Sequence, residues 1–233
     1  MTLDAFETLV KSRRATRHFK PDPLPDGMLK RLLAVAQWAP SGYNLQPTHF
    51  VAVTKPELKK DLYAACLDQA QILEAPATVI FCGDRRVKEF HFEKSLAADY
   101  AAGAISADYE KRLRQFVPLA FDTGPVGIGW LWKTLLPPFG RFVRPIPQIP
   151  ATDMDYWLAK QVALSAMVFM LAAQSAGLST VPMEGFDELR IRTLLKLPPS
   201  IHVAIVIPIG YSATGPLKKS RLPLGDVFHE NGW

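Results

Sequence analysis

The sequence predicts one domain of mixed α-helices and β-strands. The chain has 233 residues, of which 48% are hydrophobic, so it is long and apolar enough to build one sizeable core. Apolar runs at residues 77–82 and 202–209 are typical of strands that are buried on both faces. Elsewhere, apolar side chains recur at helical spacing. Composition and periodicity therefore indicate both kinds of element, but not the order of the strands.

The first half of the chain alternates helical segments with the first two strands. Residues 4–11 form an amphipathic helix with its apolar residues on one face. An alternating segment at residues 49–53 predicts a strand that precedes the buried strand at 77–82. Further helices are expected over residues 28–38, over 56–66, shortly before residue 73, and over 85–115 with a break at Gly103.

A long apolar helix dominates the second half of the chain. Thr152 and Asp153 can cap its start, and Gly177 predicts its end. Almost every residue over 162–173 is apolar or small, so this helix is expected at the centre of the domain or in a dimer interface. The apolar run is too short to span a bilayer. The chain then continues with a short strand at residues 178–181, a turn, a helix to residue 196 and the strand at 202–209.

Residues 116–150 differ in composition from the rest of the chain. They contain seven prolines, four glycines, Trp130 and Trp132, which excludes a single helix. The segment is also too long and too apolar for a plain linker. We interpret residues 1–233 as one domain with an insertion at 116–150. This insertion is expected to act as a lid, an oligomer contact or a surface that touches a membrane.

Composition and motif spacing disfavour several classes of protein. The net charge of +5 fits an anionic ligand, and the basic residues lack the interleaved aromatics of a nucleic-acid module, so no nucleic-acid partner is expected. Cys66 and Cys82 have no CxxC spacing and are expected to be buried thiols. The five histidines form no HxH or HExxH pattern, so no metal site is predicted. The N-terminus lacks a signal-peptide pattern, and a cytoplasmic protein is expected.

Three arginines lie within five residues near the start of the chain, in the sequence SRRATRHF at residues 12–19. Arginine is planar, always charged and well matched to phosphate. Arg13, Arg14 and Arg17 cannot all be buried without anions to pair with. The stretch is therefore either a solvated surface cluster or a phosphate-binding site.

A polar loop, APSGYNLQP at residues 39–47, follows the second predicted helix. Its two prolines and its glycine exclude regular structure. Its hydroxyl and amide groups can both donate and accept hydrogen bonds. The loop is either an ordinary surface loop or one whose amides bind the polar edge of a flat heterocycle.

Four stretches resemble the nitroreductase family in sequence and in order, namely SRRATRHF at 12–19, APSGYNLQP at 39–47, PMEGFD at 182–187 and KSRLP at 219–223. The last two are most similar to the oxygen-insensitive bacterial nitroreductases. The resemblance covers about residues 5–115 and 152–229, whereas 116–150 have no counterpart that we can place. Members of this family bind flavin mononucleotide (FMN). The resemblance implies an α+β fold with a central, mostly antiparallel sheet flanked by helices, in an intertwined homodimer with two FMN sites at its interface.

The resemblance also implies which residues bind FMN. The phosphate and the polar edge of the flavin are expected to contact the basic residues Arg13, Arg14, Arg17, Lys219 and Arg221. The polar loop would line the flavin, often across the dimer interface, through Pro40, Ser41, Gly42, Asn44 and Gln46. The turn would lie against the ring, with a backbone N–H at flavin N5, through Pro182, Met183, Glu184 and Gly185. Two basic groups so distant in sequence are hard to explain as one chance patch, which favours a phosphate site.

The implied reaction is a ping-pong transfer of two electrons from NADH or NADPH, through flavin N5, to a small acceptor such as a nitroaromatic or a quinone. The cofactor performs the redox step, so no catalytic side chain is predicted, and Glu184 is not expected to be a general base. Asp68 and Gln71 stand where the family carries an asparagine and a lysine. Less positive charge near the flavin is expected to alter its redox potential or the accepted substrate.

Three alternatives remain open. Reductive dehalogenation, flavin reduction or flavin fragmentation could use the same scaffold. A flavin- or nucleotide-binding protein without turnover would keep the same FMN residues. A membrane-surface protein would use the Trp- and Pro-rich insertion with Arg141 and Arg144, although such residues more often form a packed lid.

Overall fold

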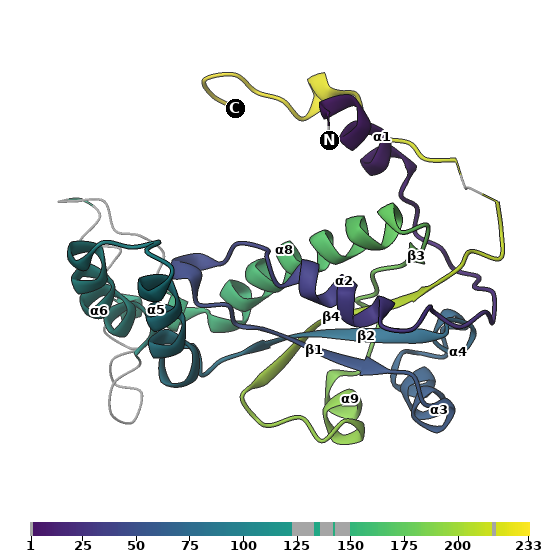
Figure 1. Cartoon of the computed structure of the whole chain (residues 1–233), viewed down its shortest axis with the longest axis horizontal. Helices are drawn as coiled ribbons and strands as arrows, with labels where there is room; N and C mark the ends of the chain where they lie inside the picture. The colour runs from purple at the N-terminus through teal and green to yellow at the C-terminus, as the bar shows by residue number, and fades with distance from the viewer. Residues whose placement is uncertain (1, 123–132, 136–141, 143–149, 216–217) are drawn as a thin grey trace.

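The fold is built around one antiparallel sheet. The computed structural model describes residues 2–122, 133–135, 142, 150–215 and 218–233 (Figure 1). The strands pair in the order β1–β2–β4–β3, with the bounds Thr48–Val53 for β1, Ala77–Asp84 for β2, Ser179–Thr180 for β3 and Ile201–Gly210 for β4. Each neighbouring pair is antiparallel. The predicted α+β fold with a mostly antiparallel sheet is confirmed.

Helices cover both faces of this sheet (Figure 1). One face carries α2 (Met28–Ala36) and α8 (Met154–Ser175), and the other carries α3 (Pro56–Ala65), α4 (Gln71–Glu74) and α9 (Glu188–Leu194). Strand β2 is buried along its whole length. Its Val79 and Phe81 pack with the first group of helices, and its Ile80 and Cys82 with the second. Burial on both faces explains why residues 77–82 are apolar apart from Thr78.

Helix α8 is the longest described helix and lies across the first face. The Asp153 side chain caps it by accepting a hydrogen bond from the Tyr156 N–H at 3.2 Å, and Gly177 follows its end with a φ of +73°. Its sheet-facing side is buried, whereas Leu164 and Met167 are 46% and 38% exposed. By length and composition α8 is the one helix in the described ranges that could cross a membrane. It packs on the sheet, however, as a core helix does.

Two helices close one end of the sheet (Figure 1). The chain leaves β2 through a π-helical turn, η2 (Val87–His91), and enters α5 (Phe92–Ala101). Gly103, with a φ of +65°, separates α5 from α6 (Ala107–Phe121), as the sequence predicts. Both helices pack against Trp157 and Leu158 of α8 and against Leu45 of the polar loop. The polar loop is thereby held next to α5 and α8.

The predicted insertion at 116–150 begins inside a helix. Helix α6 runs through Pro118 to Phe121, beyond residue 115, where we expected the helical segment to end. A short turn, η4 (Pro150–Thr152), leads from the far end of the insertion into α8. Most of the residues between these points lie outside the described ranges, so the role of the insertion stays a prediction.

The two ends of the chain project from the sheet and lie together (Figure 1). Helix α1 (Leu3–Ser12) has no buried residue, and its Leu3 and Phe6 are exposed. The tail after β4 contains the short turn η5 (Leu224–Asp226) and exposes Leu222 and Phe228. Apolar surface of this kind is typical of a contact with another molecule.

Candidate functional site

The N-terminal arginines and the C-terminal tail meet at one place. The segment after α1 runs beside β3, where the Thr16 N–H donates to the Thr180 carbonyl at 3.1 Å. The tail crosses this segment, and Lys219 Nζ donates to the carbonyls of Val10 and Arg13 at 3.3 and 3.4 Å. Together they form a cavity of about 380 Å³ lined by Ala15, Ser220 and the cationic residues Arg13, Arg14, Arg17, Lys218, Lys219 and Arg221. We call these cationic residues the basic cluster.

The basic cluster carries positive charge that its own cavity does not neutralise. Arg13 is partly buried, and its Nη1 atom has no hydrogen-bond partner within the described residues. Burial lowers the pKa of Arg13, and the nearby Arg221 and Arg14 lower it further. Burial and the same cationic neighbours also lower the pKa of Lys219. The residues that line this cavity include no carboxylate, so the cluster fits a phosphate group, whose oxygens would satisfy these donors.

The turn at residues 182–185 lies beside the basic cluster. Met183 is anchored to β4 by two backbone hydrogen bonds with Val206, at 2.9 and 3.1 Å. A second cavity, of about 440 Å³, is lined by Val181 and this turn together with Arg17, Gln69 and Gln71. Arg17 lines both cavities, so the basic cluster and the turn adjoin each other.

Two glutamines form part of the wall of this second cavity. Gln71 is only 8% exposed, and its Nε2 donates to Gln69 Oε1 at 2.9 Å and contacts Met183 Sδ at 3.5 Å. Gln69 donates in turn to the Gly185 carbonyl at 2.9 Å. Asp68 is exposed in the preceding turn, with a φ of +54°. Gln71, which the resemblance places at the position of a family lysine, is a neutral amide that contacts the turn.

The polar loop at 39–47 has an unusual backbone, which contains the short turn η1 (Gly42–Asn44). Positive φ values, of 56°, 51° and 47°, occur at Tyr43, Asn44 and Gln46. Such values are rare outside glycine and cluster at functional sites where the surroundings hold them. Here Ser41 Oγ accepts the Gln46 N–H at 2.9 Å, and Gln161 Oε1 of α8 accepts the Gly42 N–H at 2.8 Å.

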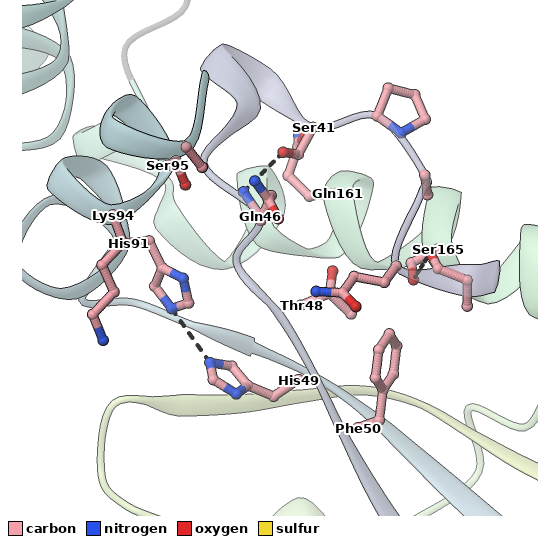
Figure 2. Close-up of a pocket in the computed structure, with 15 residues that line it drawn as sticks. Ser41, Gln46, Thr48, His49, Phe50, His91, Lys94, Ser95, Gln161 and Ser165 are labelled. Carbon is pink, nitrogen blue, oxygen red and sulfur yellow. Dashed lines mark hydrogen bonds between the residues drawn. The ribbon is translucent and has the colours of Figure 1, made fainter. Parts of the chain in front are cut away.

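The polar loop lines a third cavity, of about 440 Å³, which we call the loop cavity (Figure 2). Pro40, Ser41 and Gln46 border it, whereas Gly42 does not, and the Asn44 side chain donates to Asp99 Oδ1 at 2.6 Å. Residues of the basic cluster and of the turn are not among those that line it. In one chain, the predicted FMN residues therefore form two separate groups.

The sequence analysis missed a group of side chains beside the loop cavity. His49, near the start of β1, and His91, at the end of η2, have their Nε2 atoms 3.3 Å apart (Figure 2). Each of these atoms lies 3.9 Å from Oδ2 of Asp84, the last residue of β2. Burial lowers the pKa of His91, and His49 lowers it further, which favours a neutral imidazole. Burial alone would raise the pKa of Asp84, but hydrogen bonds from Arg86 outweigh it, so the pKa is lowered and the carboxylate is charged.

Comparison with known proteins supports the family resemblance over most of the chain, although the family model stops before the stretch at 219–223. The sequence model of the Nitroreductase family matches residues 10–211. An NADH dehydrogenase from Thermus thermophilus is 28% identical over 225 residues, which cover 97% of this chain and 95% of the relative. An oxygen-insensitive NAD(P)H nitroreductase from Salmonella typhimurium is 26% identical, with 94% of this chain and 95% of the relative covered.

Solved structures show the same fold. A nitroreductase-like protein from Streptococcus mutans has a TM-score of 0.77 at 23% identity, covering 99% of this chain and 100% of that chain. A protein from Exiguobacterium sibiricum in complex with FMN has a TM-score of 0.74 at 20% identity, covering 97% of both chains. The fold is thus that of the nitroreductase-like α+β proteins. The chain belongs to the nitroreductase family and is an oxidoreductase of that family.

Proposed function

We propose that the protein is an FMN-dependent oxidoreductase that transfers two electrons from NADH or NADPH to a small acceptor such as a nitroaromatic or a quinone. The observation that carries this proposal is the basic cluster, which holds a buried arginine donor without a partner among the described residues and adjoins the cavity of the turn. The family and the structural neighbour in complex with FMN support the identity of the anion. When bound, FMN supplies the redox chemistry, because its N5 accepts and gives hydride.

Different residues would bind different parts of FMN. The basic cluster would hold the phosphate through charge-assisted hydrogen bonds. The turn at 182–185 would lie against the ring. The Met183 N–H already donates to Val206, so we assign the backbone donor for N5 to Glu184 or Gly185. The Glu184 carboxylate is given no acid or base role, since solvent can supply the protons.

We further propose that the protein is a homodimer in which the polar loop of one copy completes the site of the other. The loop cavity lies apart from the basic cluster in one chain, so a second copy is needed to bring Pro40, Ser41 and Gln46 to the same flavin. The exposed apolar side chains of α1, α8 and the tail supply surface for such a contact. The apolar stripe of α8 at Leu164 and Met167 would form the centre of the interface.

The insertion at 116–150 is proposed to cover the acceptor and thereby to select it. Helix α6, which carries the start of the insertion, packs on Leu45 of the polar loop. This contact brings the first residues of the insertion, those within α6, close to the polar loop. Replacing 123–149 by a short linker should therefore alter the preference among acceptors more than it alters FMN binding, and the opposite result would contradict this assignment.

The visible absorption spectrum of the purified, desalted protein tests the main proposal. NADPH and then NADH are added under nitrogen, and flavin bands that bleach support a reductase and identify the preferred donor. Bands that persist with both donors would leave a flavin-binding protein without this turnover. A colourless protein that also fails to take up added FMN would contradict the proposal as a whole.

A further inference from the structure

Three ligand-type side chains meet beside the loop cavity although they come from three elements. Strands β1 and β2 pair so that His49 lies opposite Cys82, and Asp84 follows Cys82 by two residues on β2. Diagonal cross-strand neighbours of this kind are within reach of long side chains. His91 arrives from η2, on the other side of the chain reversal after β2. Within the described residues, this is the one group of three His, Cys, Asp or Glu side chains that could hold a metal ion.

The spacing of the three atoms matches the coordination sphere of a small divalent ion. Separations of 3.3, 3.9 and 3.9 Å define a common centre about 2.2 Å from each atom, and zinc bonds to histidine nitrogen and carboxylate oxygen are about 2.0–2.2 Å long. The two ring centroids are 5.3 Å apart while the Nε2 atoms are 3.3 Å apart, so each ring presents its Nε2 edge to the other. The two imidazole nitrogens therefore face each other, and Asp84 Oδ2 lies 3.9 Å from both.

The carboxylate is held in place by hydrogen bonds from Arg86. Asp84 is 1% exposed, and its Oδ1 accepts the backbone N–H of Arg86 at 2.9 Å. The Arg86 guanidinium donates to Oδ2 at 3.0 Å. A carboxylate oxygen has two lone pairs, so Oδ2 can accept this bond and still bind an ion. Ligating carboxylates are commonly oriented by such outer hydrogen bonds, and Arg86 would have that positioning role.

The backbone that carries His91 is also unusual. Residues 87–91 form a π-helical turn, which is rare and occurs frequently at functional sites. The wider turn changes the direction of the side chains relative to a regular α-helix. It ends at His91, directly before α5 begins at Phe92. The unusual backbone and the cluster of ligand atoms are two separate observations at the same place.

We propose that His49, His91 and Asp84 bind a divalent transition-metal ion of the zinc class, with its open side toward the loop cavity. Two histidines and one carboxylate are a ligand set used for catalytic zinc and for non-haem iron, and they leave positions for other ligands. Both imidazoles line the loop cavity, whereas the buried carboxylate does not, so the open positions face the cavity. They would take water or an oxygen atom of a small molecule there. None of these three residues belongs to the predicted FMN site.

Titration with zinc chloride tests this proposal on the full-length protein after treatment with a chelator. Isothermal calorimetry should show one Zn²⁺ bound per chain. The affinity should fall at least tenfold in His49→Ala and, independently, in His91→Ala. His229→Ala, which removes a histidine from the exposed tail, is the matched control and should bind zinc as the unaltered protein does. Diffraction data at the zinc absorption edge should place the ion between the two imidazoles.

Several outcomes would overturn the proposal. They are no zinc binding, binding that is equal in all the variants, or an ion located elsewhere on the surface. Asp84→Asn should also weaken zinc binding, but it breaks the ion pair with Arg86, so circular dichroism must first show that this variant folds. If Asp84→Asn does not fold, the two histidine variants still decide the test. FMN content is measured separately on the same samples, so failure of the metal site and failure of the FMN assignment give different results.

Discussion

The basic cluster and the loop cavity differ in how the chain assembles them. The basic cluster joins residues from the two ends of the chain, but each contribution is visible in the sequence as a short run of cations. The loop cavity is lined by amides, hydroxyls, imidazoles and one lysine, Lys94, from several elements, and of these the sequence pointed only to the polar loop. Unpaired charge is expensive to bury, so a cluster of cations is either solvated or bound to an anion. Neutral polar groups do not need a partner of opposite charge.

The two regions also differ in how complete they are within one chain. The basic cluster and the turn at 182–185 adjoin each other through Arg17. The polar loop, which the family resemblance assigns to the same cofactor, lines a cavity without either of them. This difference is the basis of our proposal that the first region binds FMN by its own residues and that the second contributes from another copy of the chain.

The largest effect is expected from a variant that separates the two copies of the proposed dimer. Leu164→Glu places a charge on the exposed apolar stripe of α8, and burying it in an interface would cost several kcal/mol, on the order of 3 or more. We expect the dimer to dissociate and FMN retention to fall together, although Leu164 lines neither region. Light scattering after size exclusion, with the flavin absorbance of each peak, measures both effects.

The control for this variant is Leu189→Glu on α9, which covers the opposite face of the sheet and is 72% exposed. It should leave both mass and flavin content unchanged. A monomeric Leu164→Glu protein that keeps its FMN would show that the loop of a second copy is not needed. If Leu164→Glu remains a dimer, α8 does not lie in the interface.

The next largest effect is expected in the basic cluster. Arg13→Ala removes a partly buried donor and should weaken FMN binding by about 1.5–3 kcal/mol, or roughly 10- to 150-fold in Kd. Arg221→Ala should act in the same direction. Fluorescence titration of the flavin-free protein with FMN measures both, and Arg31→Ala, exposed on α2, is the control. Unchanged FMN affinity in both variants would show that the arginines form only a solvated surface cluster.

A smaller effect is expected at Gln71, in the cavity beside the turn at 182–185. Gln71→Lys adds the positive charge that the family resemblance implies here and should raise the midpoint potential of the bound flavin. Reduced flavin that is bound tenfold more tightly relative to the oxidised form corresponds to about 30 mV for a two-electron couple. Equilibration with reference dyes measures the potential, and Gln71→Met is the neutral control. An unchanged or lower potential would show that Gln71 does not face the flavin.

The smallest expected effect concerns the loop itself. Gln161→Leu removes the acceptor of the Gly42 N–H and should lower the free energy of unfolding by about 1 kcal/mol, or roughly 2–4 °C in Tm. FMN affinity should fall less than in Arg13→Ala. Thermal denaturation measures the first effect. Gln174 lies on the same helix and makes an exposed hydrogen bond to Ser12, so Gln174→Leu is the control and should lower stability by less. An equal loss in both variants would show that the Gln161 contact stabilises the protein no more than an exposed hydrogen bond does.

Much of the fold could be predicted from local patterns. The apolar run at 77–82 predicts the doubly buried β2, and Asp153 and Gly177 predict the ends of α8. Periodicity, capping groups and turn residues act over a few residues, so they are visible in the sequence. The end of α6 was misplaced, because Pro118 and the change in composition suggested a break that packing of Val117 and Phe121 overrides.

The candidate site was predictable only in part. The sequence by itself determined the residue types that suit a phosphate, and the family resemblance supplied the turn and the loop. Only the tertiary structure decided that Lys219 meets Arg13, that Gln69 and Gln71 contact the turn, and that the loop lies apart. It alone brought His49 and His91 to Asp84. The reason is physical: residue type sets what a side chain can bind, whereas strand register and helix packing set which distant side chains share one space.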